Sequence, residues 1–485
     1  MRRRAQRAIM LVVGLAAGYA AAPFALADST QENQIALDVT QMRMAAELNL
    51  HNGDTARALA FANALLQRDP MDITALLIRA HALRARGEYT TAQTTARTAW
   101  RAAQSDNHKF AAAMLMAQSL SSQGKRTRAQ LWLRRAAQIA PSERHAARAA
   151  RDFKYVRRQN QWRTHLSFTL APNSNINNGS SRDSSSLLYQ LTNPFNIDGA
   201  GEIALGAASQ ALSGIETGVQ VQSRYRFHQT ERTAHDLRLG LSYRTYHLSS
   251  SSKDDLAADD AARVARGEEA NNLTGSDFAY GTLELGYGYK QLRADKRGEF
   301  SLSADLGQSF YGGERYNRYL RARVGQTYYA NQTTKYDFGA AAEKRRSEGG
   351  SDQHVMSLSA GMSRALANGD GLYLGVAVTS TRADLERLEY DELRLRSGYV
   401  LGRDVMGTRL QFGISTSFRD YDVSPHDPSG RREFQVAAEV TATFKQIDYY
   451  GFNPTVSLSA STTDSNIGLY DVNRVGLSIG IASSF

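Results

Sequence analysis

Apolar and small polar residues alternate along the last two thirds of the chain. The final segment is the clearest example, with apolar residues at Val475, Leu477, Ile479 and Ile481 and small or polar residues between them. A period of two places alternate side chains on opposite faces of a β-strand. A strand with one apolar face and one face of small or polar residues is typical of a lipid-embedded β-barrel.

Fourteen such segments predict fourteen strands. They span residues 162–170, 214–228, 235–248, 277–292, 298–311, 316–330, 335–346, 354–366, 371–382, 388–401, 408–421, 432–444, 452–464 and 473–485. An even number of strands fits a closed bacterial barrel, and closure is required because lipid satisfies no free backbone group. A large soluble β-sandwich or propeller is the alternative interpretation.

The predicted connections are short on one side and long on the other. Short turns include 230–234, 294–298 and 367–370, whereas polar loops occupy 172–213, 248–276 and 422–431. This asymmetry is typical of outer-membrane barrels, as are Tyr and Phe near the strand ends.

The first third of the chain is rich in alanine and arginine, which favour helices. Three copies of one pattern recur, each with a glycine five residues before an alanine, namely Gly53/Ala58, Gly87/Ala92 and Gly124/Ala129, with further small residues at Ala46 and Ala80. The spacing is close to the 34-residue period of tetratricopeptide (TPR) repeats. We predict repeats at 39–72, 73–106 and 110–143 and a closing helix at 144–158. Ordinary alanine-rich helical hairpins are the alternative.

The N-terminus has the pattern of a secretory signal peptide. Four arginines precede an apolar run from Ala8 to Ala22, and Ala25-Leu26-Ala27 resembles a cleavage site. An N-terminal anchor helix is the alternative. We therefore divide the chain into a signal peptide (1–27), a TPR-like helical domain (28–158) and a β-barrel (159–485).

The chain contains no cysteine, which excludes disulfides, thiolate metal sites and lipidation of this chain itself.

Basic residues crowd the helical part, where few carboxylates oppose them. An exported protein rarely meets nucleic acid, so we expect no nucleic-acid partner. The basic residues have three remaining interpretations: a surface that binds an acidic protein cargo, a surface that binds anionic lipid, or a helical face that is simply solvated. The candidate cargo-binding surface comprises Arg84, Arg86, Arg97, Arg101, Lys125, Arg126, Arg128, Arg134 and Arg135.

No catalytic or phosphate-binding motif is present, so we expect no enzyme and no cofactor. Asp254-Asp255 and Asp259-Asp260 lie in a predicted long loop, where carboxylates bind calcium or are simply solvated. Charges on the predicted lumen faces either line a conduit or pair with one another; they are Arg321, Arg323, Glu343, Arg345, Glu392, Arg394 and Arg396.

Two segments carry a family resemblance. One follows the first strand and contains Pro172, Asn175, Ile176 and Asn177; the other lies near the end and contains Pro454, Ser465, Asn466 and Tyr470. With the order of TPR repeats before barrel, they make the chain resemble the surface lipoprotein assembly modulator family over nearly its whole mature length.

The resemblance implies a fourteen-stranded barrel in the outer membrane of a Gram-negative bacterium, with its TPR domain in the periplasm. It implies a translocator that delivers a partner protein, lipidated or soluble, to the cell surface or the medium. The barrel-assembly machinery, with Phe485 as the terminal assembly signal, and outer-membrane lipid are the other expected partners. A TPR-barrel exopolysaccharide export porin is the runner-up, and a passive porin or adhesin is a third class.

Overall fold

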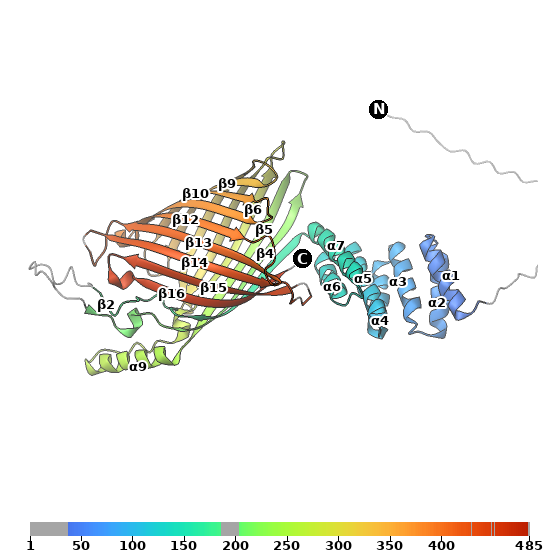
Figure 1. The fold of residues 1–485 in the computed structure, drawn as a ribbon, viewed down its shortest axis with the longest axis horizontal. Coiled ribbons are helices and arrows are strands. Elements are labelled where there is room, and N and C mark those ends of the chain that lie inside the picture. The colour runs from blue at the N-terminus through green and yellow to red at the C-terminus, as the bar shows by residue number, and fades with distance from the viewer. Residues whose placement is uncertain (1–36, 186–202, 428, 448, 451, 484–485) are drawn as a thin grey trace, which may run out of the picture.

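The computed structural model describes residues 37–185, 203–427, 429–447, 449–450 and 452–483. The predicted signal peptide and the terminal Phe485 lie outside these residues. A stack of helices extends from one end of a β-barrel, and the two parts lie along one long axis (Figure 1). We call this end of the barrel the helix end and the opposite end the loop end.

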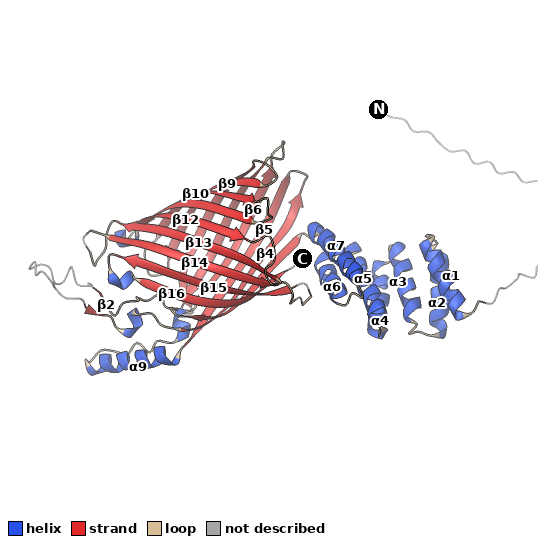
Figure 2. Ribbon diagram, viewed as in Figure 1, coloured by secondary structure: helices blue, strands red, loops and turns tan. Residues whose placement is uncertain are grey.

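Seven helices lie between Val39 and Gln159 of the described chain (Figure 2). They are α1 (Val39–His51), α2 (Thr55–Arg68), α3 (Ile73–Ala85), α4 (Tyr89–Ala102), α5 (Asp106–Ser122), α6 (Arg126–Gln138) and α7 (Glu143–Gln159). The first three begin after aspartates, whose side chains accept a backbone N–H of the first turn and so satisfy a donor that the helix leaves free.

The glycine and alanine pattern of the predicted repeats has a direct structural role. Gly53, Gly87 and Gly124 each end the first helix of a pair with φ between +77° and +85°, a conformation that glycine adopts without a Cβ penalty. Every alanine of the pattern is fully buried, because the paired helices approach closely there. The TPR-like arrangement of α1–α6 with α7 as a closing helix is confirmed.

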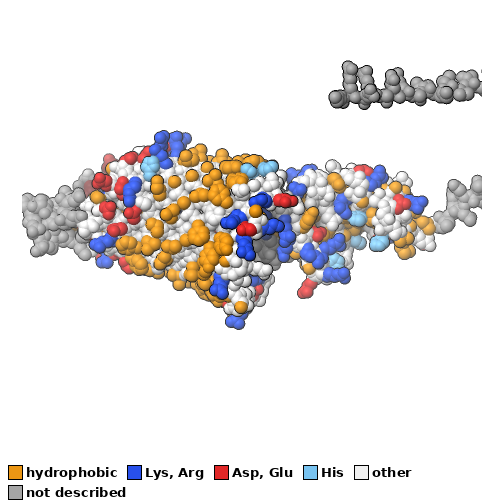
Figure 3. Space-filling view, turned by 90° about the horizontal axis from the view of Figure 1, so that it is seen from above, with side chains coloured by type: hydrophobic (Ala, Val, Ile, Leu, Met, Phe, Trp, Pro, Cys, Tyr) orange, Lys and Arg blue, Asp and Glu red, His pale blue; other side chains and the backbone are white. Residues whose placement is uncertain are grey.

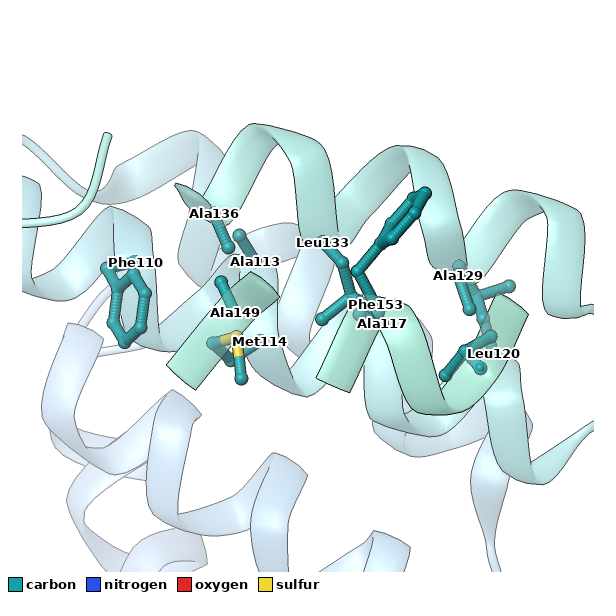
Figure 4. Close-up of a cluster of buried hydrophobic side chains, with 11 residues drawn as sticks. Phe110, Ala113, Met114, Ala117, Leu120, Ala129, Leu133, Ala136, Ala149 and Phe153 are labelled. Carbon is teal, nitrogen blue, oxygen red and sulfur yellow. The ribbon is translucent and has the colours of Figure 1, made fainter. Parts of the chain in front are cut away.

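The largest hydrophobic cluster of the helical part joins α5, α6 and α7 (Figure 4). Leu133 from α6 and Phe153 from α7 are almost fully buried in it, among alanines such as Ala117 and Ala136. The helices nearest the barrel therefore form one packed unit, which can hold a fixed position against the barrel.

The strands form a closed antiparallel barrel in which each strand pairs with its neighbours in sequence, and the last pairs with the first. Its fourteen described strands are β1 (Trp162–Asn173), β4 (Gly214–Gln229), β5 (Thr233–Leu248), β6 (Tyr280–Leu292), β7 (Gly298–Tyr311), β8 (Glu314–Tyr329), β9 (Thr334–Ser347), β10 (Gln353–Ala365), β11 (Gly371–Ala383), β12 (Tyr390–Val400), β13 (Thr408–Tyr421), β14 (Arg431–Phe444), β15 (Phe452–Ser465) and β16 (Val472–Ser483). The predicted fold class is confirmed.

The loop end is more structured than the sequence predicts. The segment expected to be a polar loop at 248–276 contains a helix, α9 (Ser250–Ala265), so the two aspartate pairs lie on a helix. The strand expected to begin at 277 begins at Tyr280, after a short 3-10 helix. A two-stranded ribbon, β2 (Ser184–Ser185) with β3 (Ile203–Ala204), lies in the first loop. The long loops thus fold on themselves.

The barrel wall has an apolar outer surface. On many strands the exposed large hydrophobic residues occupy alternate positions, as Leu237, Leu239 and Leu241 do on β5. Figure 3 shows apolar side chains gathered over the wall and charged ones at its loop end and over the helices. Such a band matches the hydrocarbon core of a membrane. Within the described residues, no helix is long and apolar enough to cross a membrane.

Candidate functional site at the seam of the barrel

The pairing of β1 with β16 closes the barrel, and it is incomplete. Its register contains Leu170 with Ile479 and Asn173 with Gly476 among the described residues. Every other neighbouring pair is registered along nearly its whole length, including β1 with β4 from Trp162 to Asn173. We call the facing edges of β1 and β16 the seam.

The loop end of the seam is held by the first family segment. The Asn175 amide donates to the carbonyl oxygen of Asn473 at 3.2 Å, and Arg474 donates to the Asn175 carbonyl oxygen at 3.0 Å. The backbone N–H of Ser174 also bonds the carbonyl of Val475 at 3.1 Å. Asn175 is fully buried. This side chain therefore ties the two strands together where the barrel closes.

The other residues of that segment support the same loop. Ile176 packs in a buried cluster with Leu212 and Tyr246. The Asn177 side-chain oxygen accepts the backbone N–H of Leu212 at 2.9 Å. Pro172 lies on β1, opposite Ile215 of β4, within the part of the seam that β16 covers.

The second family segment meets the loop that continues from the first one. Ser180 donates to the carbonyl oxygen of Gly468 at 2.7 Å. Ser465 ends β15, Asn466 bonds the Asp427 carboxylate at 3.0 Å, and Tyr470 lies 4.0 Å beneath the Arg431 guanidinium. Pro454 stands apart, at the helix end of β15. No local pattern in the sequence indicates this contact, because nearly 300 residues separate its two sides.

Asp427 is a titratable group of this loop network whose hydrogen bonds shift its ionisation. Burial favours its neutral form, but hydrogen bonds from the Ser429 side chain and backbone and from Asn466 outweigh burial and lower its pKa. The carboxylate is therefore charged at neutral pH and can keep both loops in place.

The helix end of the seam lies under α6 and α7. Arg134 of α6 donates to the carbonyl oxygen of Tyr450 at 2.8 Å, and its guanidinium stacks 4.1 Å from the Phe452 ring centroid. The backbone N–H of Tyr450 in turn donates to Gln138 at 2.9 Å. Tyr450 has a φ of +54°, which is costly for a tyrosine. Both of its backbone groups are bound to α6, and this contact fixes the helices to the barrel.

A large cavity opens at this end of the seam, with a volume of about 1320 Å³. It is lined by α6 and α7, by β1, β4 and β5, and by single residues of β6, β8, β15 and β16. Six of its lining residues are arginines, whereas Glu284 is the single carboxylate among the described residues that line it; the arginines are Arg134, Arg157, Arg163, Arg224, Arg238 and Arg323. We call it the seam cavity.

Six of the seven predicted lumen charges form ion pairs, whereas Arg396 forms none within the described residues. Asp305 of β7, with no exposed side-chain surface, accepts a hydrogen bond from Arg238 at 2.6 Å and forms an ion pair with Arg323 at 2.9 Å. Arg321 and Arg345 both bind Glu343. Of the two interpretations left open by the sequence, mutual pairing holds for these residues. For Glu392 it also holds, because Arg394 binds it at 2.7 Å.

The predicted basic surface is spread over several elements. Arg84 belongs to α3, Arg86 caps that helix and pairs with Glu88 at 3.3 Å, and Lys125 precedes α6. The remaining residues lie on α4 (Arg97, Arg101) and on α6 (Arg126, Arg128, Arg134, Arg135). Arg134 is half-buried and contacts the barrel; Arg97, Arg101, Arg128 and Arg135 are exposed.

The aspartate pairs of α9 carry no metal-like arrangement. Within the described residues, no three His, Cys, Asp or Glu side chains converge as metal ligands would. Asp260 instead accepts the backbone N–H groups of Asn271 and Asn272 at 2.7 and 3.1 Å. This bonding folds the loop back along α9.

Comparison with known proteins matches the barrel to one family. A family model described as surface lipoprotein assembly modifier matches residues 162–485. No curated protein matches the chain. Among solved structures, an outer membrane channel from Pseudomonas putida is 9% identical with a TM-score of 0.30, covering 65% of this chain and 95% of that one. The type III secretion translocator chaperone SycD of Yersinia enterocolitica is 17% identical with a TM-score of 0.23, covering 25% of this chain and 83% of that one.

Proposed function

The chain belongs to the surface lipoprotein assembly modifier family, and on that premise we propose that it is an outer-membrane translocator for proteins. In this proposal its TPR-like helices capture a partner protein in the periplasm. The barrel then delivers that partner, through or along its wall, to the cell surface or the medium. The partner is a secreted or surface-exposed protein, lipidated or soluble.

One observation carries the proposal: α6 and α7 are fixed on the barrel directly over the seam cavity. TPR solenoids present extended surfaces that suit segments of a partner protein. A segment held on these helices would therefore lie next to the cavity. Six arginines around the cavity speed encounter with an acidic segment, because long-range attraction raises association rates.

The connections of the barrel support the proposed orientation. The helix end carries turns such as Tyr329–Thr334 and Ala365–Gly371, whereas the loop end carries the long folded loops and α9. Outer-membrane barrels have short turns on the periplasmic side. We therefore assign the helices to the periplasm, where an exported protein first becomes available for capture.

Two further partners belong to the proposal. The barrel sits in outer-membrane lipid, and the barrel-assembly machinery inserts it by recognising the terminal strand with Phe485. Replacing Phe485 with serine should lower the amount of assembled, heat-modifiable protein in the outer membrane. Neither catalysis nor a cofactor nor nucleic acid is needed for this transport.

The direct test is protease accessibility on intact cells. A candidate secreted protein is co-expressed with the full chain, with a version lacking residues 28–158, and with no such chain. We expect digestion at the cell surface only with the full chain. Normal display without the chain overturns the translocator, and normal display with the barrel alone overturns the receptor role of the helices. Heat-modifiable migration verifies that each barrel has assembled.

A further inference from the structure

Within the part of the chain that the structure describes, the helix end of the seam presents two strand edges without partners. β1 uses one edge to pair with β4 from Trp162 to Asn173, and β16 uses one edge to pair with β15 from Val472 to Ser483. Among the described residues, the register between β1 and β16 contains no pair on the helix side of Leu170 and Ile479. Every residue from Trp162 to Leu166 is exposed, whichever face it occupies.

Free strand edges in a membrane barrel are costly. Each unpaired N–H or C=O at membrane depth costs several kcal/mol, so such edges either close or receive another strand. An acyl chain cannot satisfy these groups, because it has neither donor nor acceptor. An extended polypeptide can, by the pairing that binds peptides to exposed sheet edges elsewhere.

The seam is also built differently at its two ends. At the loop end, Asn175, Ser180 and Arg474 join the strands through the hydrogen bonds described above. At the helix end the seam cavity takes that place, and α6 and α7 cover it. The first end is therefore held together by hydrogen bonds, whereas the second is open.

The cavity favours acidic occupants. Asp236 and Asp305 lie behind its wall and already bind Arg224, Arg238 and Arg323. Arg163 lines the cavity, is exposed, and forms no ion pair within the described residues. The excess of arginine over carboxylate leaves positive charge for a segment rich in Asp or Glu.

We propose that the free edges of β1 and β16 receive an extended acidic segment of the transported protein, which adds as a β-strand at the seam. This deepens the proposed transport function and rests on it for the identity of the occupant. Backbone pairing gives general affinity, and alternate side chains of the segment reach the arginines of the cavity.

Hydrogen exchange on the purified full chain in micelles tests the free edges independently of transport. Alternate N–H groups of β1 point to β4, so about half the amides of 162–169 should exchange fast while the facing part of β4 stays protected. A peptide of alternating Glu and Val should slow that exchange, and its Lys-Val counterpart should not. Full protection of 162–169 from the outset, no effect of the acidic peptide, or equal protection by both peptides overturns the proposal.

A pair of introduced cysteines tests whether the seam must open during transport. The chain has no native cysteine, so only the introduced pair can be crosslinked. Thr169→Cys with Gly480→Cys continues the register of Leu170 with Ile479, and Leu170→Cys with Ile479→Cys is the matched control at a position already paired. Bridging the first pair, by oxidation or with a short bis-maleimide, should reduce surface display at least tenfold. Bridging the control pair should leave display unchanged, and reduced proteins verify folding.

The outcomes separate this inference from the proposed function. Unchanged display with the first pair bridged overturns strand addition, while loss of display on removing residues 28–158 would still support the translocator. Suppose instead that bridging blocks a lipidated cargo but not the same cargo without its acylated cysteine. That result would mean that the seam conveys an acyl chain, and it would overturn the proposal that a polypeptide strand adds there.

Discussion

Arg134 and Tyr450, 316 positions apart in the sequence, are joined by a 2.8 Å hydrogen bond from a guanidinium to a backbone carbonyl. The bond links α6 to the turn between β14 and β15. Residues 160–161 connect the last helix to the first strand along the chain. The Arg134–Tyr450 bond adds a second attachment, so the helices have a defined position on the barrel.

Replacing Arg134 with alanine should loosen this junction. The variant loses a charged hydrogen bond and the stacking on Phe452, together about 2 kcal/mol. The undocked population then rises about thirtyfold. Trypsin cleavage between α7 and β1 should accelerate accordingly, and band patterns over time would measure it. Arg128→Ala, an exposed change on the same helix, should cleave as the parent does. Equal rates for both variants would show that the contact does not hold the helices.

Leu133 should be a main support of the helical domain. It is 1% exposed in the cluster of α5, α6 and α7, so Leu133→Ala should cost about 2–5 kcal/mol through lost burial and a cavity. Thermal melting followed by helix circular dichroism measures the loss. Leu131→Ala, on the same helix but 57% exposed, is the control and should melt within about 2 °C of the parent. Barrel migration on gels should be unchanged in both.

Asp305 should be essential for the stability of the barrel wall. Asp305→Asn leaves Arg238 and Arg323 in the lumen without their shared carboxylate, and breaking a buried pair on one side costs about 3–5 kcal/mol. The temperature of heat-modifiable conversion should fall, and channel recordings should shift toward anions. Asp391→Asn breaks the more exposed pair with Arg382 and should change conversion little. A parent-like Asp305→Asn barrel would show that the lumen pairs are not structural.

His81 should make the helical domain less stable in mild acid. Burial, then the charges of Arg84 on the same helix and Arg148 on α7, lower its pKa below the ordinary value of 6.5. Just below pH 6.5, His81 is therefore protonated in the unfolded chain but largely neutral in the folded one. Stability is intact above pH 6.5 and falls below it, by at most about 1.4 kcal/mol per pH unit. Urea unfolding at pH 7.5 and 5.5 measures the loss.

His81→Gln should remove most of this acid sensitivity, because glutamine does not titrate. His51→Gln, at the exposed end of α1, should keep it. An acid response that survives the His81 substitution unchanged would assign the effect to other groups.

The sequence predicted the elements well because their signals are local. The period-two pattern placed strands such as β7 and β13 at the very bounds that the structure has, and the repeat glycines marked the turns of the helical pairs. It missed α9, because a run of serine and aspartate is typical of loops. Ser249 nevertheless caps that helix by accepting the N–H of Ser252, and this capping signal was available.

The candidate site was less predictable. The sequence placed Arg134 in a general basic surface and singled out the two family segments. It could not show that Arg134 contacts Phe452, or that the second family segment meets the loop that continues from the first one. Each of these contacts joins parts of the chain that are distant in sequence, and no local pattern reports the distance between them.

By itself the sequence determined a helical repeat domain followed by a fourteen-stranded barrel with an oily exterior, because side-chain periodicity and the backbone freedom of glycine act over a few residues. Only the tertiary structure decided which lumen charges pair, where the helices dock and that the closing strands part beneath them. Those features depend on how the barrel closes when β16 pairs with β1. The geometry of this closure is determined by all the strands together and not by any single strand.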